Sequence, residues 1–338
     1  MSASTGTCAA AAAAAAAEHW LGRPCREVEV TLPDDSTMRL DVEETERDLL
    51  GATSVVRKPP NDDPDATRNL PVKVRIVPGA CRGIRFLAGW GVGKVTRPGL
   101  RLEPGEAAIN PEPRRMIGQE LESRGLRDCL VVVSVPGGVD VASRTFNGRL
   151  GIEGGISILG TSGRVRPFSV EAVVESTRMQ MDLARAAGWD HLCLVPGHIG
   201  ARALGATGEF HPDQIVEVSN FWGEALDHAG RIGIRSLLLS GHPGKLAKLA
   251  QGQWNTHSSE GSTAVGAVRN LALEMGLVPD CGNASVDGIF LSLEPTSRRV
   301  LGDQLARHVV RIASARVGIP CGVRLTGYDG SILGEARP

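Results

Sequence analysis

Hydrophobic and polar residues alternate with a period of two in the first part of the chain. The alternation runs over residues 28–32 and again over 38–42, on either side of a polar turn at Pro33–Ser36. Residues 71–77 (PVKVRIV) repeat it. A period of two is typical of a strand with one buried face. The pattern therefore predicts a β-hairpin at 26–44 and a further half-buried strand at 71–77.

An alanine-rich segment precedes these strands. Alanine has the highest helix propensity, so we expect a helix over residues 8–21. Thr7 is a suitable N-cap, and Gly22 with Pro24 ends the helical pattern. The first part of the chain is therefore predicted to be α+β.

The pattern changes after residue 128. Residues 129–136 (CLVVVSVP) are apolar without alternation, which is typical of a strand buried on both faces. A helix is predicted over 169–187, with Ser169 as N-cap and Gly188 after its end. Beyond it we expect three apolar strands, at 191–196, 214–219 and 236–241, and three helices, at 221–230, 243–251 and 261–276.

Alternating strands and helices of this kind favour a parallel sheet with helices on both faces. The sequence therefore predicts an α/β protein of two domains. An N-terminal α+β domain with hairpins and a mixed sheet is expected over residues 1–165. A smaller α/β domain with a mainly parallel sheet is expected over 166–315. The tail 316–338 predicts one more hairpin, around Asp329 and Gly330, which we expect to return to the first domain.

Composition excludes several classes of partner. The chain has 338 residues and a net charge of -1, so neither nucleic acid nor an anionic membrane is favoured electrostatically. Aromatic residues make up 4%, too few for base-stacking platforms. The seven cysteines form no short metal-binding spacing, so we expect buried thiols in a reducing, cytoplasmic environment and no protein-bound metal. No segment is long and apolar enough to span a membrane.

Two glycine-rich strings resemble phosphate loops without matching them. "GWGVGKVTRPG" (89–99) has three residues between the glycines of its G-x-x-x-G-K match, where the Walker pattern needs four, and Val95 follows the lysine. "SGHPGKLAK" (240–248) fails in the same way, and neither is a G-x-G-x-x-G fingerprint. Glycines at the ends of strands explain both strings equally well.

Charged residues offer one further indication. Residues 82–115 contain seven basic and three acidic side chains, which suits either an anionic ligand or a solvated basic surface. His242 follows a predicted strand end, where α/β sheets hold ligands, and His257 follows a polar pair. An isolated histidine is also commonly structural. The residues alone therefore indicate an α/β enzyme with a small anionic ligand.

Seven strings, in order, carry a resemblance to a known family: "TGTCAAAAAA" (5–14), "DDPDAT" (62–67), "GVGKVTRPGL" (91–100), "AINPEPRRMI" (108–117), "VSVPGGVDVASRTFNGRLGIEGGISILGTSGRVRP" (133–167), "VSNFWGEALDHAG" (218–230) and "GHPGKLAKLAQGQWNTHS" (241–258). The chain resembles the cobalt-precorrin-5B C1-methyltransferase family, CbiD, from about residue 4 to at least 275. The resemblance implies a two-domain α/β architecture. It also implies methyl transfer from S-adenosyl-L-methionine to C1 of a cobalt-corrinoid in cobalamin biosynthesis, with the cobalt carried by the substrate.

The matched strings supply candidate binding residues for the macrocycle's carboxylates and for the methyl donor. We expect Gly151–Gly163 to form part of a cleft between strand 129–136 and helix 169–187, with Arg149, Arg164 and Arg166 at its rim. The full candidate set is Thr5, Thr7, Lys94, Thr96, Asn110, Arg114, Arg115, Gly137, Gly138, Thr145, Asn147, Arg149, Gly151, Gly154, Gly155, Ser157, Gly160, Thr161, Arg164, Gly197, Asn220, Gly241, Lys245, Asn255 and Thr256.

Three residues are candidates for a base that removes a ring proton. His242 and His257 are the first, because imidazole titrates near neutrality, and Asp140 is a weaker one. A small-molecule kinase and a non-catalytic tetrapyrrole carrier or scaffold are the alternative functions. A homo-oligomer and transient handover to other cobalamin-pathway enzymes are further expectations.

Overall fold

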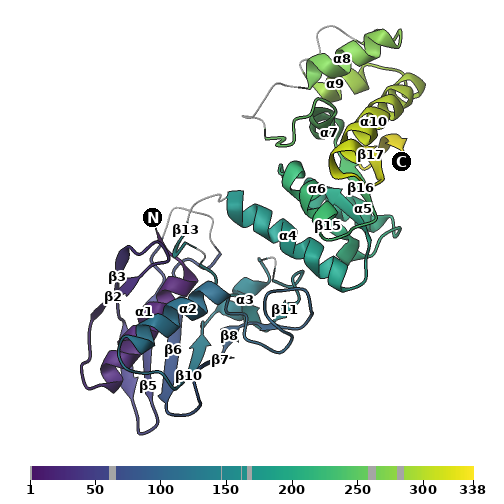
Figure 1. Ribbon diagram of the computed structural model, residues 1–338. Helices are drawn as coiled ribbons and strands as arrows, with labels where there is room; N and C mark the ends of the chain where they lie inside the picture. The colour runs from purple at the N-terminus through teal and green to yellow at the C-terminus, as the bar shows by residue number, and fades with distance from the viewer. Residues whose placement is uncertain are drawn as a thin grey trace. The chain divides into compact units, whose positions relative to one another are not determined.

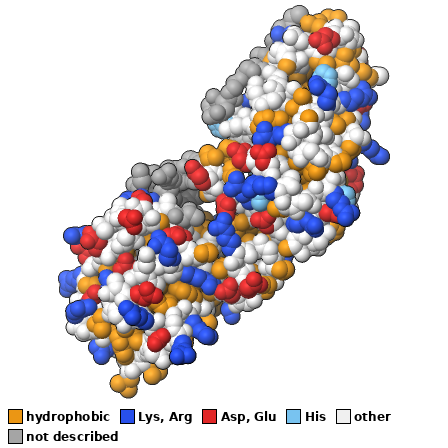
Figure 2. All heavy atoms as spheres, viewed as in Figure 1, with side chains coloured by type: hydrophobic (Ala, Val, Ile, Leu, Met, Phe, Trp, Pro, Cys, Tyr) orange, Lys and Arg blue, Asp and Glu red, His pale blue; other side chains and the backbone are white. Residues whose placement is uncertain are grey.

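The computed structural model describes residues 2–60, 66–145, 147–160, 162–165, 170–257, 264–279 and 285–338. The chain divides into two compact units, Met1–Ser169 and Val170–Pro338 (Figure 1). On the face drawn in Figure 2, described side chains of both charge signs are interspersed, in keeping with the net charge of -1.

A five-stranded mixed sheet forms the frame of the first unit, in the order β4-β5-β6-β10-β7. Its neighbours are antiparallel except for β10 and β7, which are parallel. Strand β6 buries every second side chain, as predicted for residues 71–77. The strands are β4 (Glu44–Arg47), β5 (Ala52–Arg57), β6 (Pro71–Pro78), β7 (Ile84–Ala88) and β10 (Cys129–Ser134).

Strand β10 corrects one prediction. Val131 and Val133 are fully buried, whereas Val132 is only half-buried. Val132 lies opposite Arg75 of β6, so the second face of the sheet is partly polar. The expected burial of this strand on both faces is therefore wrong. An apolar run here reflects one core face and one half-covered face, as antiparallel sheets often have.

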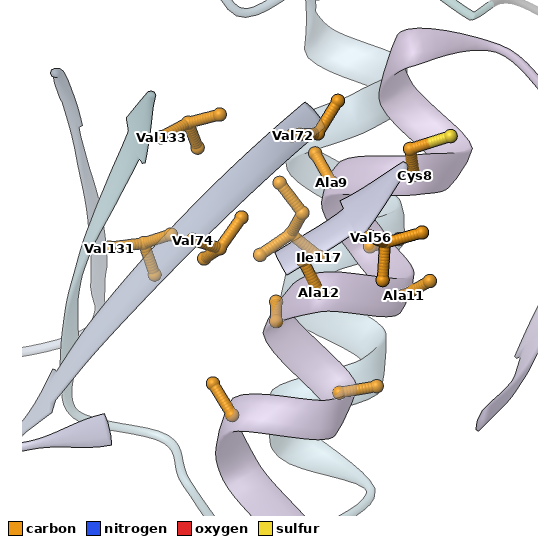
Figure 3. Close-up of a cluster of buried hydrophobic side chains, with 14 of the residues drawn as sticks. Cys8, Ala9, Ala11, Ala12, Val56, Val72, Val74, Ile117, Val131 and Val133 are labelled. Carbon is orange, nitrogen blue, oxygen red and sulfur yellow. The ribbon is translucent and has the colours of Figure 1, made fainter. Parts of the chain in front are cut away.

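Helix α1 (Thr5–Trp20) is the centre of the first unit. Every residue from Thr5 to Ala17 is buried. Figure 3 shows its alanines gathered with Ile117 of helix α2 (Pro111–Glu122) and with valines of β5, β6 and β10. Small side chains allow a helix to pack closely on every side. The helix begins earlier than predicted, because Ser4 rather than Thr7 is the N-cap: Ser4 Oγ accepts from the Thr7 N–H at 3.0 Å.

The predicted hairpin is confirmed. Strands β2 (Glu27–Thr31) and β3 (Thr37–Asp41) are antiparallel, with Val28 opposite Leu40. Short pairs complete the unit: β1 with β13, β9 with β11, and β8 with β12. Their bounds, with those of helix α3, are β1 (Ser2–Ala3), β8 (Gly91–Val92), β9 (Lys94–Val95), α3 (Gly138–Ala142), β11 (Ile152–Glu153), β12 (Gly155–Ile156) and β13 (Arg164–Val165).

The second unit holds the predicted parallel sheet. Its order is β15-β14-β16-β17-β18, and all neighbours are parallel except β17 and β18. The three expected strands are β14 (His191–Val195), β15 (Ile215–Glu217) and β16 (Ser236–Gly241). Chain order reverses direction between β14 and β16. Ligands of open α/β sheets bind at this switch point, outside the carboxyl ends of the strands.

Helices cover the two faces of this sheet unequally. Leu194 and Leu239 pack in a core that includes α4, α6, α7 and α10, whereas Cys193 and Val195 pack with α5. The helices predicted at 169–187, 221–230, 243–251 and 261–276 are present, although Ser169 and residues 261–263 lie outside the described residues. The bounds are α4 (Val170–Ala186), α5 (His198–Ala206), the 3-10 turn Pro212–Gln214, α6 (Trp222–Arg231), α7 (Pro243–Ala250), α8 (Val265–Glu274), α9 (Val286–Leu291) and α10 (Pro295–Val317).

The C-terminal hairpin belongs to the second unit. Strand β17 (Cys321–Thr326) pairs with β16, and β18 (Ile332–Ala336) pairs with β17. The expectation that this segment returns to the first domain is wrong. Its physical reason is backbone pairing: β16 would otherwise present an open edge, and the buried Val323 and Leu325 complete the second core. With these strands the second unit is as long as the first, not smaller.

Candidate functional site

The threonines near the N-terminus are bonded within the first unit. Thr5 Oγ1 accepts from the Leu159 N–H at 2.9 Å, and Thr7 Oγ1 donates to the carbonyl of Gly163. Thr7 is fully buried. These bonds join the start of α1 to the glycine-rich segment, so both hydroxyls serve the fold.

Asn147 and Ser157 form a second internal connection. Asn147 Nδ2 donates to the carbonyl of Gly155 at 3.1 Å, and Ser157 Oγ donates to Asn147 Oδ1 at 3.3 Å. Both side chains are less than a tenth exposed. Their polar groups are therefore used to fold the glycine-rich segment back on itself.

Three glycines of the candidate set stand where a side chain would not fit. A Cβ on Gly155 would lie 2.3 Å from the backbone of Gly91, and one on Gly138 would lie 2.2 Å from the Gly91 carbonyl oxygen. On Gly160 it would lie 2.3 Å from Ser4 Oγ. Packing inside the unit explains these glycines without a ligand.

The arginines of this region also have partners inside the unit. Arg114 donates to Glu106 Oε1 at 2.8 Å and to two backbone carbonyls, and Arg115 is paired with Glu112. The hydrogen bond from Arg114 lowers the pKa of Glu106. Arg164 donates to Ser36 Oγ at 3.1 Å. The excess of basic residues in the sequence is therefore partly used in ion pairs.

The other candidates of the first unit occupy turns and element ends. Lys94 and Arg149 are exposed, Thr96 Oγ1 donates to the Gly151 carbonyl at 2.9 Å, and Thr145 Oγ1 donates to the Ala142 carbonyl at 2.8 Å. Asn110 precedes α2, Gly137 precedes α3, Asp140 is exposed in α3, and Gly151 and Gly154 have positive φ. Thr161 and Arg166 lie outside the described residues.

A cavity of about 560 Å³ opens at the carboxyl ends of β14, β16 and β17 in the second unit. Gly197 and Gly241 stand at the ends of the first two strands, and Tyr328 follows the third. The place is the topological switch point of the sheet. The predicted residues Gly197, Gly241, His242 and Lys245 all line it.

His242 is held on both ring nitrogens. Nδ1 accepts from the Gly244 N–H at 3.1 Å, which makes His242 the N-cap of α7. Nδ1 therefore carries no proton, so Nε2 carries it and faces Asp287 Oδ1 at 3.2 Å. The ring also stacks on Tyr328, with centroids 4.2 Å apart. In this arrangement the basic lone pair is used by the cap, so His242 would have to release α7 to act as a base.

Lys245 is the second polar group of the cavity that the sequence predicted. Its Nζ donates to Asn220 Oδ1 at 2.8 Å, and Thr256 Oγ1 donates to the same oxygen at 3.1 Å. Burial lowers the pKa of Lys245, and the charge of Lys248 lowers it further. Asn220 thus positions the lysine through a neutral contact, which leaves its charge without a counterion among these bonded partners.

His257 and Asn255 lie outside the wall of the cavity. Lys248 Nζ donates to the carbonyl of His257 at 3.0 Å, and Asn255 Oδ1 accepts from the His257 N–H at 3.1 Å. The His257 side chain is exposed. The structure therefore brings His242 and Lys245 together at the cavity, and it does not bring the His257 side chain there.

Two residues of the site were missed by the sequence analysis. Asp287 lies in the first turn of α9 and binds His242, and Tyr328 follows β17. Tyr328 is the single tyrosine of the chain. Because the C-terminal tail was expected in the first domain, the sequence did not place Tyr328 at this cavity. No sequence motif marks Asp287, because its partner His242 is 45 residues away in sequence.

The described residues also bear on the classes of metal and membrane protein. Among them, no group of three or more His, Cys, Asp or Glu side chains is arranged to hold a metal ion. Within the same residues, no helix is long and apolar enough to cross a membrane.

Comparisons with known proteins agree with one another. A protein of Syntrophotalea carbinolica named cobalt-precorrin-5B C(1)-methyltransferase is 43% identical, covering 98% of this chain and 95% of its own length. Proteins of the same name from Burkholderia multivorans and Methanocaldococcus jannaschii are each 36% identical, covering 99% and 91% of this chain and 96% and 82% of their own lengths.

A crystal structure of cobalamin biosynthesis protein (cbiD) from Archaeoglobus fulgidus is 26% identical and covers 82% of this chain and 84% of its own, with a TM-score of 0.41. The family model described as CbiD matches residues 1–167. Because that model and a relative 43% identical over nearly the whole length both match, the chain belongs to the CbiD family.

Proposed function

We propose that this chain methylates C1 of cobalt-precorrin-5B to give cobalt-precorrin-6A, with S-adenosyl-L-methionine as the methyl donor. The observation that carries this proposal is the 43% identity to a protein named for that reaction, over 98% of the chain. The similarity extends through both units, so it includes the cavity of the second unit as well as the glycine-rich segment of the first.

The methyl transfer requires no covalent bond between the protein and either reactant. The transfer breaks the donor's methyl carbon–sulfur bond and forms a carbon–carbon bond at C1, while the electron pair of the broken bond stays on sulfur as a neutral thioether. Positioning two reactants in line is worth several kcal/mol of a barrier, up to about 7–11 kcal/mol in well-oriented systems. Excluding water protects the sulfonium, whose charge disappears in the step.

The residues of the second unit suit such a positioning role. His242 fixes the start of α7 through its cap, and Asp287 and Tyr328 hold the imidazole ring from two directions. Lys245 presents a cation at the same wall. A base is an additional requirement only if a ring proton leaves during the transfer.

One incubation tests the function. The purified protein is mixed with cobalt-precorrin-5B and donor carrying a ¹³C methyl group, and the product is analysed by NMR. We expect one labelled methyl group at C1. A corrinoid that binds and is recovered without label would instead identify a carrier. Assembly into a homo-oligomer, handover to other enzymes of the pathway and a cytoplasmic location stay predictions.

A further inference from the structure

The cavity of the second unit has the size and charge of a site for one small ligand. Its 560 Å³ lies within the range of about 300–1,000 Å³ that small-molecule pockets occupy. Lys245 and Lys248 are the two lysines among its described lining residues, and no arginine is among them. Lys248 is already used by the carbonyls of Thr256 and His257. A macrocycle fringed by many carboxylates would require more cations than this wall offers.

Tyr328 supplies a flat aromatic surface at this cavity. One face of its ring stacks on His242 at 4.2 Å between centroids, with the planes inclined by 23°. The residue is nevertheless 76% exposed. A ring fixed on one side and open on the other is suited to stack a purine, because every base has a π-face.

The polar groups around it are of opposite charge. Lys245 is held in place by the neutral Asn220, so its ammonium is suited to a carboxylate partner. Asp287 uses Oδ1 for His242, and its side chain is 35% exposed, so Oδ2 can accept from hydroxyl groups. A cation, an anion and an aromatic face at one wall match a zwitterionic nucleoside better than a polyanion.

We propose that this cavity binds S-adenosylmethionine, with adenine against Tyr328, the ribose hydroxyls at Asp287 and the donor's carboxylate at Lys245. The inference rests on the proposed function for the identity of the donor, and it adds the location and the contacts. It places the donor in the second unit rather than beside the glycine-rich segment of the first.

Gly197 offers a way to block the site with little disturbance of the fold. The residue lines the cavity, and a Cβ there would meet no heavy atom within 4 Å. Its φ of 168° is extended backbone that other residues also adopt. Gly197→Leu therefore fills the cavity. Gly266→Leu is the matched control, because Gly266 is exposed on α8, outside the cavity wall, and also has open space around it.

Calorimetric titration of the full chain with S-adenosylhomocysteine is the measurement. We expect binding by the wild type and by Gly266→Leu, and affinity at least tenfold weaker for Gly197→Leu. Tyr328→Ser is the second variant, because an exposed side chain contributes little to folding. We expect it to weaken binding about ten- to a hundredfold through lost stacking. Thermal unfolding of each variant verifies the fold.

The outcomes separate the two proposals. Tight binding by the wild type with unchanged affinity in Tyr328→Ser and in a folded Gly197→Leu would overturn this site and leave the methyltransferase standing. If Gly197→Leu does not fold, the Tyr328→Ser result alone decides. No binding of S-adenosylhomocysteine by the folded wild type, together with no methyl transfer, would remove the proposed function and this inference with it.

Discussion

The glycine-rich segment of the first unit, with the start of α1 bonded to it, and the cavity wall of the second unit both contain glycines and polar side chains, but they use them differently. In the first unit, Thr7 and Asn147 are buried and bonded to nearby backbone carbonyls. In the second unit, Lys245 and Tyr328 line an open cavity. Glycines differ likewise: Gly155 is pressed against Gly91, whereas Gly197 has free space. Residue type alone therefore does not separate a folding role from a binding role.

The largest expected effect is on stability, and it tests the difference between Gly155 and Gly197. Gly155→Val places a side chain against the backbone of Gly91, and backbone cannot move aside cheaply. We expect the free energy of unfolding to fall by about 3 kcal/mol or more, as severe overpacking does. Gly197→Val should change it by less than about 1 kcal/mol. Urea unfolding of both variants measures the difference. Equal midpoints would show that the two glycines do not differ as described.

Lys245→Met tests the cavity directly. Loss of a charge-assisted hydrogen bond of about 1.5–3 kcal/mol should weaken S-adenosylhomocysteine about tenfold or more. In the wild type, affinity should also decline as the pH rises through the pKa of Lys245, because only the ammonium attracts the carboxylate. That pKa lies below the ordinary 10.5, so the decline should begin earlier than for an exposed lysine. Titrations across alkaline pH measure it. A wild-type profile identical to that of Lys245→Met would contradict the assignment.

Thr7→Val tests whether the hydroxyl of Thr7 serves the fold of the first unit and not a ligand site. The substitution leaves the buried carbonyl of Gly163 without its hydroxyl partner. We expect a loss of about 1–3 kcal/mol in the free energy of unfolding, and unchanged affinity for S-adenosylhomocysteine. Thr37→Val is the matched control, because Thr37 is exposed and should cost less than about 0.5 kcal/mol. A folded Thr7→Val protein with weakened donor binding would show that this hydroxyl is part of the ligand site.

His242 should behave as a helix cap. Its replacement by Ala removes the acceptor for the Gly244 N–H, which costs about 1 kcal/mol, whereas Asn is itself a good N-cap. We expect His242→Asn to recover most of the stability lost in His242→Ala, as measured by thermal unfolding. Equal stability in both variants, with methyl transfer abolished in both, would instead identify the imidazole as a proton acceptor.

The last prediction concerns the reactivity of the cysteines, because buried thiols should react more slowly than partly exposed ones in both units. Burial raises the pKa of Cys8 and of Cys193 to about 12, so neither thiol is ionised near neutrality. We expect iodoacetamide at pH 8 to modify Cys25 and Cys81 in the native protein and to spare Cys8, Cys193, Cys129 and Cys321. Peptide mass spectrometry locates the label. Rapid modification of Cys8 would contradict a fully buried α1.

Much of the fold could be predicted because it depends on local pattern. Alternation gave the hairpin β2–β3 and strand β6, and apolar runs gave β14, β15 and β16. Helix α10 also carries a signal, since Leu301, Leu305 and Val309 recur every fourth position and are buried. The pairing of β17 with β16 could not be predicted in this way, because which sheet receives a strand depends on long-range contacts.

The candidate site was predictable only in part, for a related reason. His242 and Lys245 follow a strand end, and that position is visible in the sequence. Asp287 and Tyr328 reach the same wall from distant segments, so their proximity appears only in the folded chain. The polar residues of the first unit were predicted to bind ligands because of their residue types. In the structure they make hydrogen bonds within the unit, and no sequence pattern indicates such bonds.

A crystal structure of the full chain with S-adenosylhomocysteine tests the central claim most directly. The account predicts the ligand at the carboxyl ends of β14, β16 and β17, with its adenine on the open face of Tyr328 and its carboxylate at Lys245. A ligand found beside Gly151–Gly160 of the first unit, with the cavity of the second unit unchanged, would contradict it.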